Sequence, residues 1–92
     1  MATKISKKQT QMTKPSIPAN WQVTPVVEIA LMNAVMCWDQ HSNDSAADRE
    51  LHAMLYAQNA ADTTIEEGMD ESAWADASSA TIGLLKRIGF CK

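Results

Sequence analysis

Apolar residues recur every three or four positions through the middle of the chain, which is the spacing of one face of an α-helix. The first such segment runs from Pro25 to about Gln40. Thr24 can cap its first turn, and Pro25 suits the first helical position because its missing N–H would have no partner there. The main apolar stripe of this segment consists of Val27, Leu31, Ala34, Val35 and Trp38.

A second apolar stripe lies on nearly the opposite side of the same segment and consists of Ile29, Met32 and Met36. A helix that is apolar on two sides needs a covering on both of them. The third helical segment, a second subunit or a different protein could each provide that covering.

The next helical segment follows a short turn, residues 41–44. Ser45 is a predicted N-cap, and Asp48 three positions later resembles a capping box. The apolar stripe that we expect to face the core consists of Ala47, Leu51, Met54, Leu55 and Ala61. A turn this short predicts that the two helices form an antiparallel hairpin.

A third helical segment starts near Asp62, and its apolar positions continue at helical spacing to Ile88. Gly68 interrupts it at a cost of about 1 kcal/mol relative to alanine. The segment is therefore either one long helix or a short helix followed by a longer one from Asp70. Gly89 and Phe90 fit a Schellman stop, in which Phe90 folds back on Leu85.

These patterns predict an all-α fold, because no alternating apolar pattern is long enough to indicate a strand. We expect a small antiparallel bundle of three helices, or four if Gly68 breaks the third, in residues 21–92. A flexible basic arm, residues 1–20, precedes it. The 92 residues allow one domain. A core made by about seventy residues is stable by only a few kcal/mol, so a partner or a second copy would add useful buried area.

Charge is distributed unevenly along the chain. The net charge is −3, yet four lysines (Lys4, Lys7, Lys8 and Lys14) precede the first acidic residue, Glu28. The arm could neutralise phosphates, but the acidic body would repel nucleic acid and no helix has a basic face. We therefore expect no sequence-specific nucleic-acid binding. The chain has neither a membrane-spanning run nor the apolar region of a secretory signal, so we expect a cytoplasmic protein without membrane contact.

The stretch from Cys37 to His52 combines a thiol, two imidazoles and several carboxylates. Cys37 and His41 have a spacing that allows a shared metal ion. Cys37 lies about 100° from the centre of the first helix's main stripe, however, and His52 about 120° from that of the second. Helical phase thus turns these side chains away from one another. We expect no metal site, no cofactor and two free cysteines, and keep a small metal-binding protein as a third alternative.

Catalytic chemistry has little support in the sequence. A Cys–His pair needs a lowered thiol pKa and a third group that orients the histidine, whereas Cys37 lies in an apolar run. The three glycines, Gly68, Gly83 and Gly89, are scattered and form no phosphate-binding loop. We therefore predict that the protein is not an enzyme and has no catalytic residues.

An acidic run without a basic residue covers residues 62–76. It is either a solvated helix face or a negative surface that docks on a basic groove of another protein. Like-charge pairs at i and i+4, such as Glu66 with Asp70 and Glu67 with Glu71, would weaken a continuous helix. Their presence favours a role in binding.

The second apolar stripe and the acidic run together predict a protein-binding module, because tryptophan and methionine are common at interface centres. We expect a stoichiometric inhibitor or adaptor, of the kind that phages and mobile elements direct against host nucleic-acid-handling proteins. The predicted partner-binding residues are Glu66, Glu67, Asp70, Glu71, Trp74, Asp76, Ile29, Met32 and Met36. The alternative is a homodimeric regulatory or structural module in which the second stripe meets its own copy.

Overall fold

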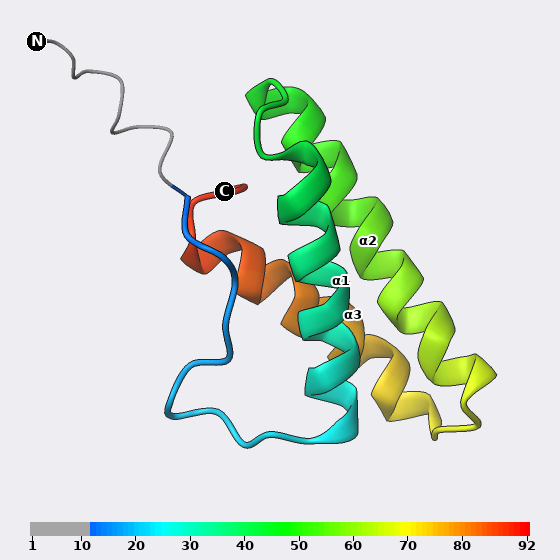
Figure 1. Cartoon of the computed structure of the whole chain (residues 1–92). Coiled ribbons are helices and arrows are strands. Elements are labelled where there is room, and N and C mark those ends of the chain that lie inside the picture. The colour runs from blue at the N-terminus through cyan, green and yellow to red at the C-terminus, as the bar shows by residue number, and fades with distance from the viewer. Residues whose placement is uncertain (1–11) are drawn as a thin grey trace, which may run out of the picture.

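The computed structural model describes residues 12–92, which form three α-helices and no strand (Figure 1). α1 spans Pro25–His41, α2 spans Ala46–Glu66 and α3 spans Glu71–Arg87. α1 and α2 form an antiparallel hairpin, and α3 crosses behind it and packs against both. The predicted all-α bundle is confirmed. None of these helices is long and apolar enough to cross a lipid bilayer.

The predicted caps define where the first two helices begin. The Thr24 hydroxyl accepts a hydrogen bond from the Val27 backbone N–H at 3.2 Å. The Ser45 hydroxyl accepts one from the Asp48 backbone N–H, also at 3.2 Å. Each cap satisfies a backbone donor that the first turn of a helix leaves without a partner.

Gly68 separates α2 from α3. Its φ of +76° lies in the left-handed region, which favours glycine. The Met69 N–H donates to the Thr64 carbonyl at 3.0 Å, which closes the end of α2. Residues 62–66, which we expected to open the third segment, instead complete α2. The helical region therefore breaks at Gly68, and the bundle has three helices in the described chain.

The end of α3 is the predicted Schellman stop. Gly89 has a φ of +80°, and its N–H donates to the Lys86 carbonyl at 3.0 Å. The Phe90 N–H donates to the Leu85 carbonyl at the same distance. Phe90 is thereby turned back into the core, where it is fully buried.

Alanines line most of the core. The fully or almost fully buried apolar residues are Ala30, Ala34, Cys37, Ala53, Ala57, Ala60, Ala61, Ala73, Ala77, Leu84, Leu85 and Phe90. Small side chains at the contacts let helix axes approach one another closely. Bulk comes mainly from the C-terminal part of the chain, through Leu84, Leu85 and Phe90.

The predicted core stripe of α2 was wrong. Leu51, Met54 and Leu55 stand on the outer face of the helix, with 51%, 64% and 54% of their surface exposed. The buried face of α2 carries alanines instead. We had assumed that the largest apolar residues mark the core, but α2 has two apolar faces and α1 and α3 cover the one with small side chains.

A hydrogen bond between two asparagines joins α1 to α2. Asn33 of α1 is almost fully buried, and its side-chain N–H donates to the Ile29 carbonyl at 3.0 Å. The Asn59 side chain of α2 donates to the Asn33 side-chain oxygen at 2.6 Å. The bond satisfies the side-chain oxygen of Asn33, and a buried polar group without a partner would cost about 1–3 kcal/mol.

Residues 12–24 form an extended lead-in that runs beside α1 (Figure 1). Pro15 and Pro18 are buried, and the Trp38 ring N–H donates to the Met12 carbonyl at 3.2 Å. We expected a flexible arm over residues 1–20. The part of the chain that packs on α1 begins before the end of that range, at Met12. Lys4, Lys7 and Lys8 lie outside the described residues.

Candidate functional site

Four large apolar side chains form a ridge on the outer face of α2. This α2 ridge consists of Leu51, Met54, Leu55 and Ile65, and each of them is more than half exposed. Burying a side chain of this size against a partner contributes about 1.5–3 kcal/mol. Single exposed apolar residues are ordinary, but a line of them along one helix marks a surface that can bind another apolar surface.

Met32 and Met36 extend the exposed apolar surface onto α1. Met32 is 64% exposed and Met36 is 39% exposed, while Ile29 in the same stripe is partly buried. α3 packs on the opposite side of α1, next to Ala30 and Ala34, and leaves the two methionines open. The predicted second stripe is therefore free of intramolecular cover at Met32 and Met36.

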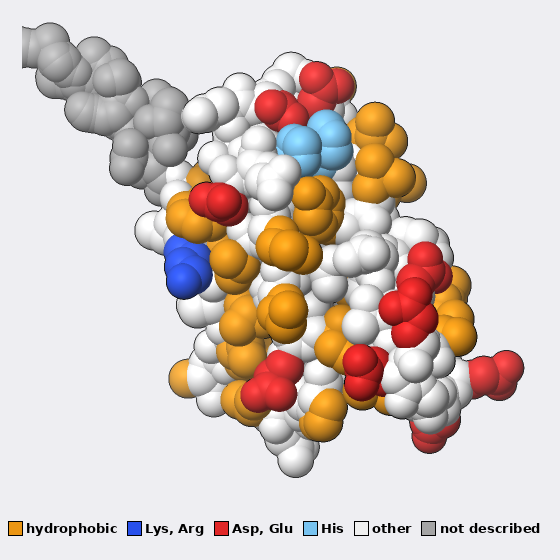
Figure 2. All heavy atoms as spheres, turned by 45° about the vertical axis from the view of Figure 1, so that its right-hand side comes forward, with side chains coloured by type: hydrophobic (Ala, Val, Ile, Leu, Met, Phe, Trp, Pro, Cys, Tyr) orange, Lys and Arg blue, Asp and Glu red, His pale blue; other side chains and the backbone are white. Residues whose placement is uncertain are grey.

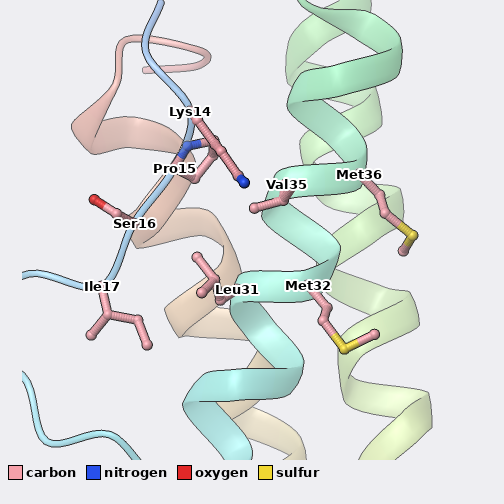
Figure 3. Close-up of a pocket in the computed structure, with 8 residues that line it drawn as sticks. All are labelled: Lys14, Pro15, Ser16, Ile17, Leu31, Met32, Val35 and Met36. Atoms are coloured by element: carbon pink, nitrogen blue, oxygen red, sulfur yellow. The ribbon is translucent and has the colours of Figure 1, made fainter.

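A groove of about 710 Å³ lies between the lead-in and α1 (Figure 3). Leu31 and Val35 point toward the lead-in, and Met32 and Met36, which also line the groove, extend from the other side of the helix. Methionine side chains adapt easily to different partner shapes, because they are unbranched and polarizable. The groove and the methionines together give α1 an apolar outer surface.

Figure 2 shows the distribution of side-chain types on one face of the molecule. Hydrophobic side chains gather in a band below the two histidines, and acidic side chains lie at several points along its edges. Basic side chains are scarce on this face. The surface is therefore apolar in its middle and negative at its margins.

The acidic residues do not form a single helix face. Glu66 ends α2, Glu67 follows it, Asp70 precedes α3 and Glu71 begins it, so all four surround the α2–α3 turn and are exposed. The like-charge pairs that we placed at i and i+4 of one helix do not exist as such, because Gly68 breaks the helix between them. That argument for binding was wrong, although the negative charge at this end of the bundle is real.

A second hollow, of about 620 Å³, combines apolar and acidic side chains at this turn. It is lined by Ile65, Met69, Asp70, Glu71 and Trp74. Trp74 is 41% exposed. The structure thus brings Trp74 together with Asp70 and Glu71 of the predicted set, and joins them to the end of the α2 ridge through Ile65. Asp76 is exposed farther along α3.

Sequence reasoning missed the α2 ridge because it assigned those residues to the core. A signal was present: Ala53, Ala57, Ala60 and Ala61 also follow helical spacing, on the side opposite Leu51. α2 has two apolar faces, and a three-helix bundle can cover only one of them. The second face is therefore free to bind another protein.

His41 and His52 meet at the end of the α1–α2 hairpin. Their rings are stacked, with centroids 3.6 Å apart and planes 8° apart. His41 Nδ1 lies 3.0 Å and His52 Nδ1 lies 3.5 Å from the same oxygen of Asp44, Oδ2. Tyr56 packs edge-on against His41, with ring centroids 5.8 Å apart.

The expectation that helical phase keeps the thiol and the imidazoles of this stretch from converging was wrong for the two histidines. The phase argument used the large-residue stripes as the helix interface, whereas the contact runs through the alanine faces. His41 follows Ala34 and Cys37 along α1, and His52 lies on the flank of α2 whose Tyr56 and Asn59 side chains also contact α1. Cys37 is fully buried. The third polar group beside the two histidines is the Asp44 carboxylate.

The surroundings of the Cys37 thiol disfavour its reactive, deprotonated form. Burial is the main reason that its pKa rises from 9.0 to about 12, and nearby Cys91 and Asp44 act in the same direction. Burial also raises the pKa of the Cys91 thiol, with a smaller contribution from Glu50. Since the thiolate is the nucleophile, Cys37 is poorly suited to attack a substrate near neutral pH.

Cys37 makes stability depend on pH in the alkaline range. The unfolded chain loses this proton near pH 9, but the folded chain keeps it to about pH 12, so the contribution is complete below pH 9 and is lost as pH rises toward 12. We expect a slope of about 1.4 kcal/mol per pH unit from this group in the free energy of unfolding. Urea denaturation from pH 8 to 11 measures it. Cys37→Ala should show a shallower slope, and an equal slope in both proteins would contradict the assignment.

Comparison of the chain with protein-family models, with curated proteins and with solved structures found no match.

Proposed function

We propose that this protein is a non-enzymatic protein-binding module that docks a partner on the α2 ridge together with Met32 and Met36. The observation that carries the proposal is the exposure of these six large side chains while alanines fill the core beneath them. A small bundle gains nothing within itself from large apolar side chains at those positions. Their burial against a partner would supply binding free energy.

The charges around this surface indicate the partner's chemistry. The hollow beside Trp74 has Asp70 and Glu71 at its rim, and Glu66 and Glu67 lie at the same turn. We infer a partner whose apolar contact surface is flanked by lysines or arginines, because opposite charges at the rim speed association and exclude wrong partners. Such basic surfaces are typical of nucleic-acid-handling proteins.

This chemistry supports a stoichiometric inhibitor or adaptor, of the kind that phages and mobile elements produce, acting in the cytoplasm. An acidic, apolar surface can occupy a groove that otherwise holds nucleic acid. Both cysteines are free, which suits a reducing compartment. The link to phages is an analogy with a type of protein and is part of the proposal.

A charge placed in the middle of the α2 ridge should abolish partner binding. We expect Leu55→Glu to lower the amount of captured partner at least about 30-fold, the effect of losing 2 kcal/mol at a central interface residue. Protein immobilised through an affinity tag placed after Lys92 and exposed to an extract of its source cells provides the measurement, with the captured protein identified by mass. Changing Glu66, Glu67, Asp70 and Glu71 to Lys should weaken capture more strongly at low salt than at high salt.

Ser79→Glu is the matched control, because it adds the same charge at an exposed position of α3 outside the proposed surface. Circular dichroism must show that each variant keeps its helices. Equal capture by the wild type, Leu55→Glu and Ser79→Glu would contradict the proposed surface.

A homodimeric module is the second candidate, and the α2 ridge is the observation that favours it. Two copies could pack their ridges against each other and bury the same side chains, in addition to the α1 stripe that we considered first. Light scattering separates the two candidates: a dimer has twice the chain mass, and Leu55→Glu should convert it to a monomer. A wild-type monomer would exclude this candidate.

A further inference from the structure

The end of the α1–α2 hairpin places two imidazoles and a carboxylate around one point. His41 comes from the last turn of α1, Asp44 from the connecting turn and His52 from α2. One nitrogen from each histidine and one Asp44 oxygen lie within 4.8 Å of one another, and all three residues are partly exposed. We propose that His41, Asp44 and His52 form a binding site for a borderline divalent metal ion, Zn²⁺ above all. This proposal does not depend on the protein-binding function.

The separations of the ligand atoms fit such an ion. Asp44 Oδ2 lies 3.0 Å from His41 Nδ1 and 3.5 Å from His52 Nδ1. Ligands about 2.1 Å from a tetrahedral zinc ion are about 3.4 Å apart from one another. Two imidazoles and a carboxylate would fill three positions, and water would fill the fourth, as in open zinc sites.

The protons now on the ring nitrogens must leave when the ion binds. The Asp48 backbone carbonyl, 2.9 Å from His52 Nδ1, can only accept, so this nitrogen carries a hydrogen. The Asp44 carboxylate accepts from His41 Nδ1 in the same way. Each ring then moves its hydrogen to Nε2 and offers the Nδ1 lone pair to the metal ion, while the carboxylate stays in place as a ligand.

The stacked rings must also turn, because parallel planes cannot both direct an in-plane lone pair at one ion. Rotation about the bond from Cβ to the ring is soft for histidine. Nδ1 is bonded to the ring carbon that lies on this axis, so a turn of moderate size moves it by less than one bond length. Both rings are partly exposed, so they have room to turn. The ligand atoms can therefore stay near the ion while the stack opens.

The neighbouring thiols fit the site less well than the histidines. The Cys37 thiol is fully buried, and its pKa of about 12 keeps it protonated. A metal ion requires the thiolate form. The predicted donor set is thus two nitrogens and one oxygen, and it connects α1 to α2 across the hairpin turn.

Titration of untagged, metal-free protein with ZnCl₂ in a calorimeter tests the site, and CoCl₂ reports the ligands through its visible spectrum. We expect one Zn²⁺ per chain and a higher melting temperature when it is bound. His52→Gln and the double variant His41→Gln with His52→Gln should each weaken binding at least about 100-fold, and Asp44→Asn at least about tenfold. Asp39→Asn and Cys91→Ser, which leave the three ligands intact, should bind as the wild type does.

Three results would overturn the proposal. Zn²⁺ could bind the wild type no more tightly than the double histidine variant, which would exclude the imidazoles as ligands. Cobalt could give the intense near-ultraviolet absorption of a thiolate complex that Cys91→Ser removes, which would assign binding to cysteine. The wild type could also show no binding at a millimolar concentration of Zn²⁺. His52→Gln alone, at a partly exposed position, keeps the test valid if the double variant does not fold.

Discussion

Phe90→Ala is expected to unfold the protein under conditions in which the wild type is folded. Phe90 is the largest fully buried side chain, and it packs in a cluster with Ala30, Ala34 and Ala53. Removing a buried phenylalanine costs about 3–5 kcal/mol. A helical domain of this size is stable by about the same amount. These three alanines are too short to turn into the space that the ring would leave, although Leu84 and Leu85 belong to the same cluster.

A hydrogen bond from α2 also holds the backbone at Phe90. The ring therefore stays in the core although it lies close to the C-terminus. Arg49 donates from Nε to the Phe90 carbonyl and from a terminal guanidinium nitrogen to the Asp44 carbonyl, both at 2.8 Å. Circular dichroism during urea denaturation provides the measurement. Leu51→Ala, which removes an exposed side chain, should cost less than about 1 kcal/mol. A Phe90→Ala protein as stable as Leu51→Ala would show that Phe90 is not part of the core.

Ala60→Leu is expected to have the second largest effect, a loss of about 3 kcal/mol or more. Ala60 is fully buried on the inner face of α2. Added carbon atoms in a well-packed core force neighbouring side chains and backbone to shift, typically at 1–3 kcal/mol, and interfaces lined by alanine leave little room for repacking. The substitution adds a larger apolar side chain, yet we predict that it lowers the midpoint of urea denaturation.

Ala47→Leu is the matched control, because it makes the same chemical change on the exposed face of the same helix. Its effect on the free energy of unfolding should stay within about 0.5 kcal/mol. Equal effects of the two substitutions would mean that the alanine face of α2 is not the buried one.

Local signals in the sequence predicted the ends of the elements well. Thr24 and Ser45 begin helices, and Gly89 with Phe90 ends one, because capping depends on a few neighbouring atoms. The short turn after His41 gave the antiparallel hairpin for the same reason. Gly68 left two alternatives open, and its left-handed conformation decides between them.

The faces of the helices were harder to predict, because they depend on how three helices share limited contact area. In α2 the hydrophobic pattern allowed either Leu51 or Ala53 to face inward. The choice depends on which positions of α2 contact α1 and α3, and such contacts join residues far apart in the sequence, as the Asn33–Asn59 hydrogen bond does. Periodicity within one helix carries no information about such a partner. The wrong choice for α2 also hid the meeting of His41 with His52.

Some of the binding residues could likewise be predicted from local sequence, whereas others depend on how the helices pack. Local composition located the acidic turn around Glu67 and Asp70, and the apolar pattern located Met32 and Met36. The α2 ridge, which we now regard as the centre of the surface, required knowledge of which side of α2 the other helices cover. The exposure of Leu51 and Leu55 is thus the main thing that the structure adds.

The most direct test of this account is the free energy of unfolding of the double variant Leu51→Glu with Leu55→Glu, measured in urea at two low protein concentrations. If both leucines lie on the outer face of α2, the variant should unfold cooperatively and within about 1 kcal/mol of the wild type. Charges buried in a core would instead be far more costly than this small domain can tolerate. A variant that loses its helices or its cooperative transition would contradict the exposed ridge and the binding function proposed from it.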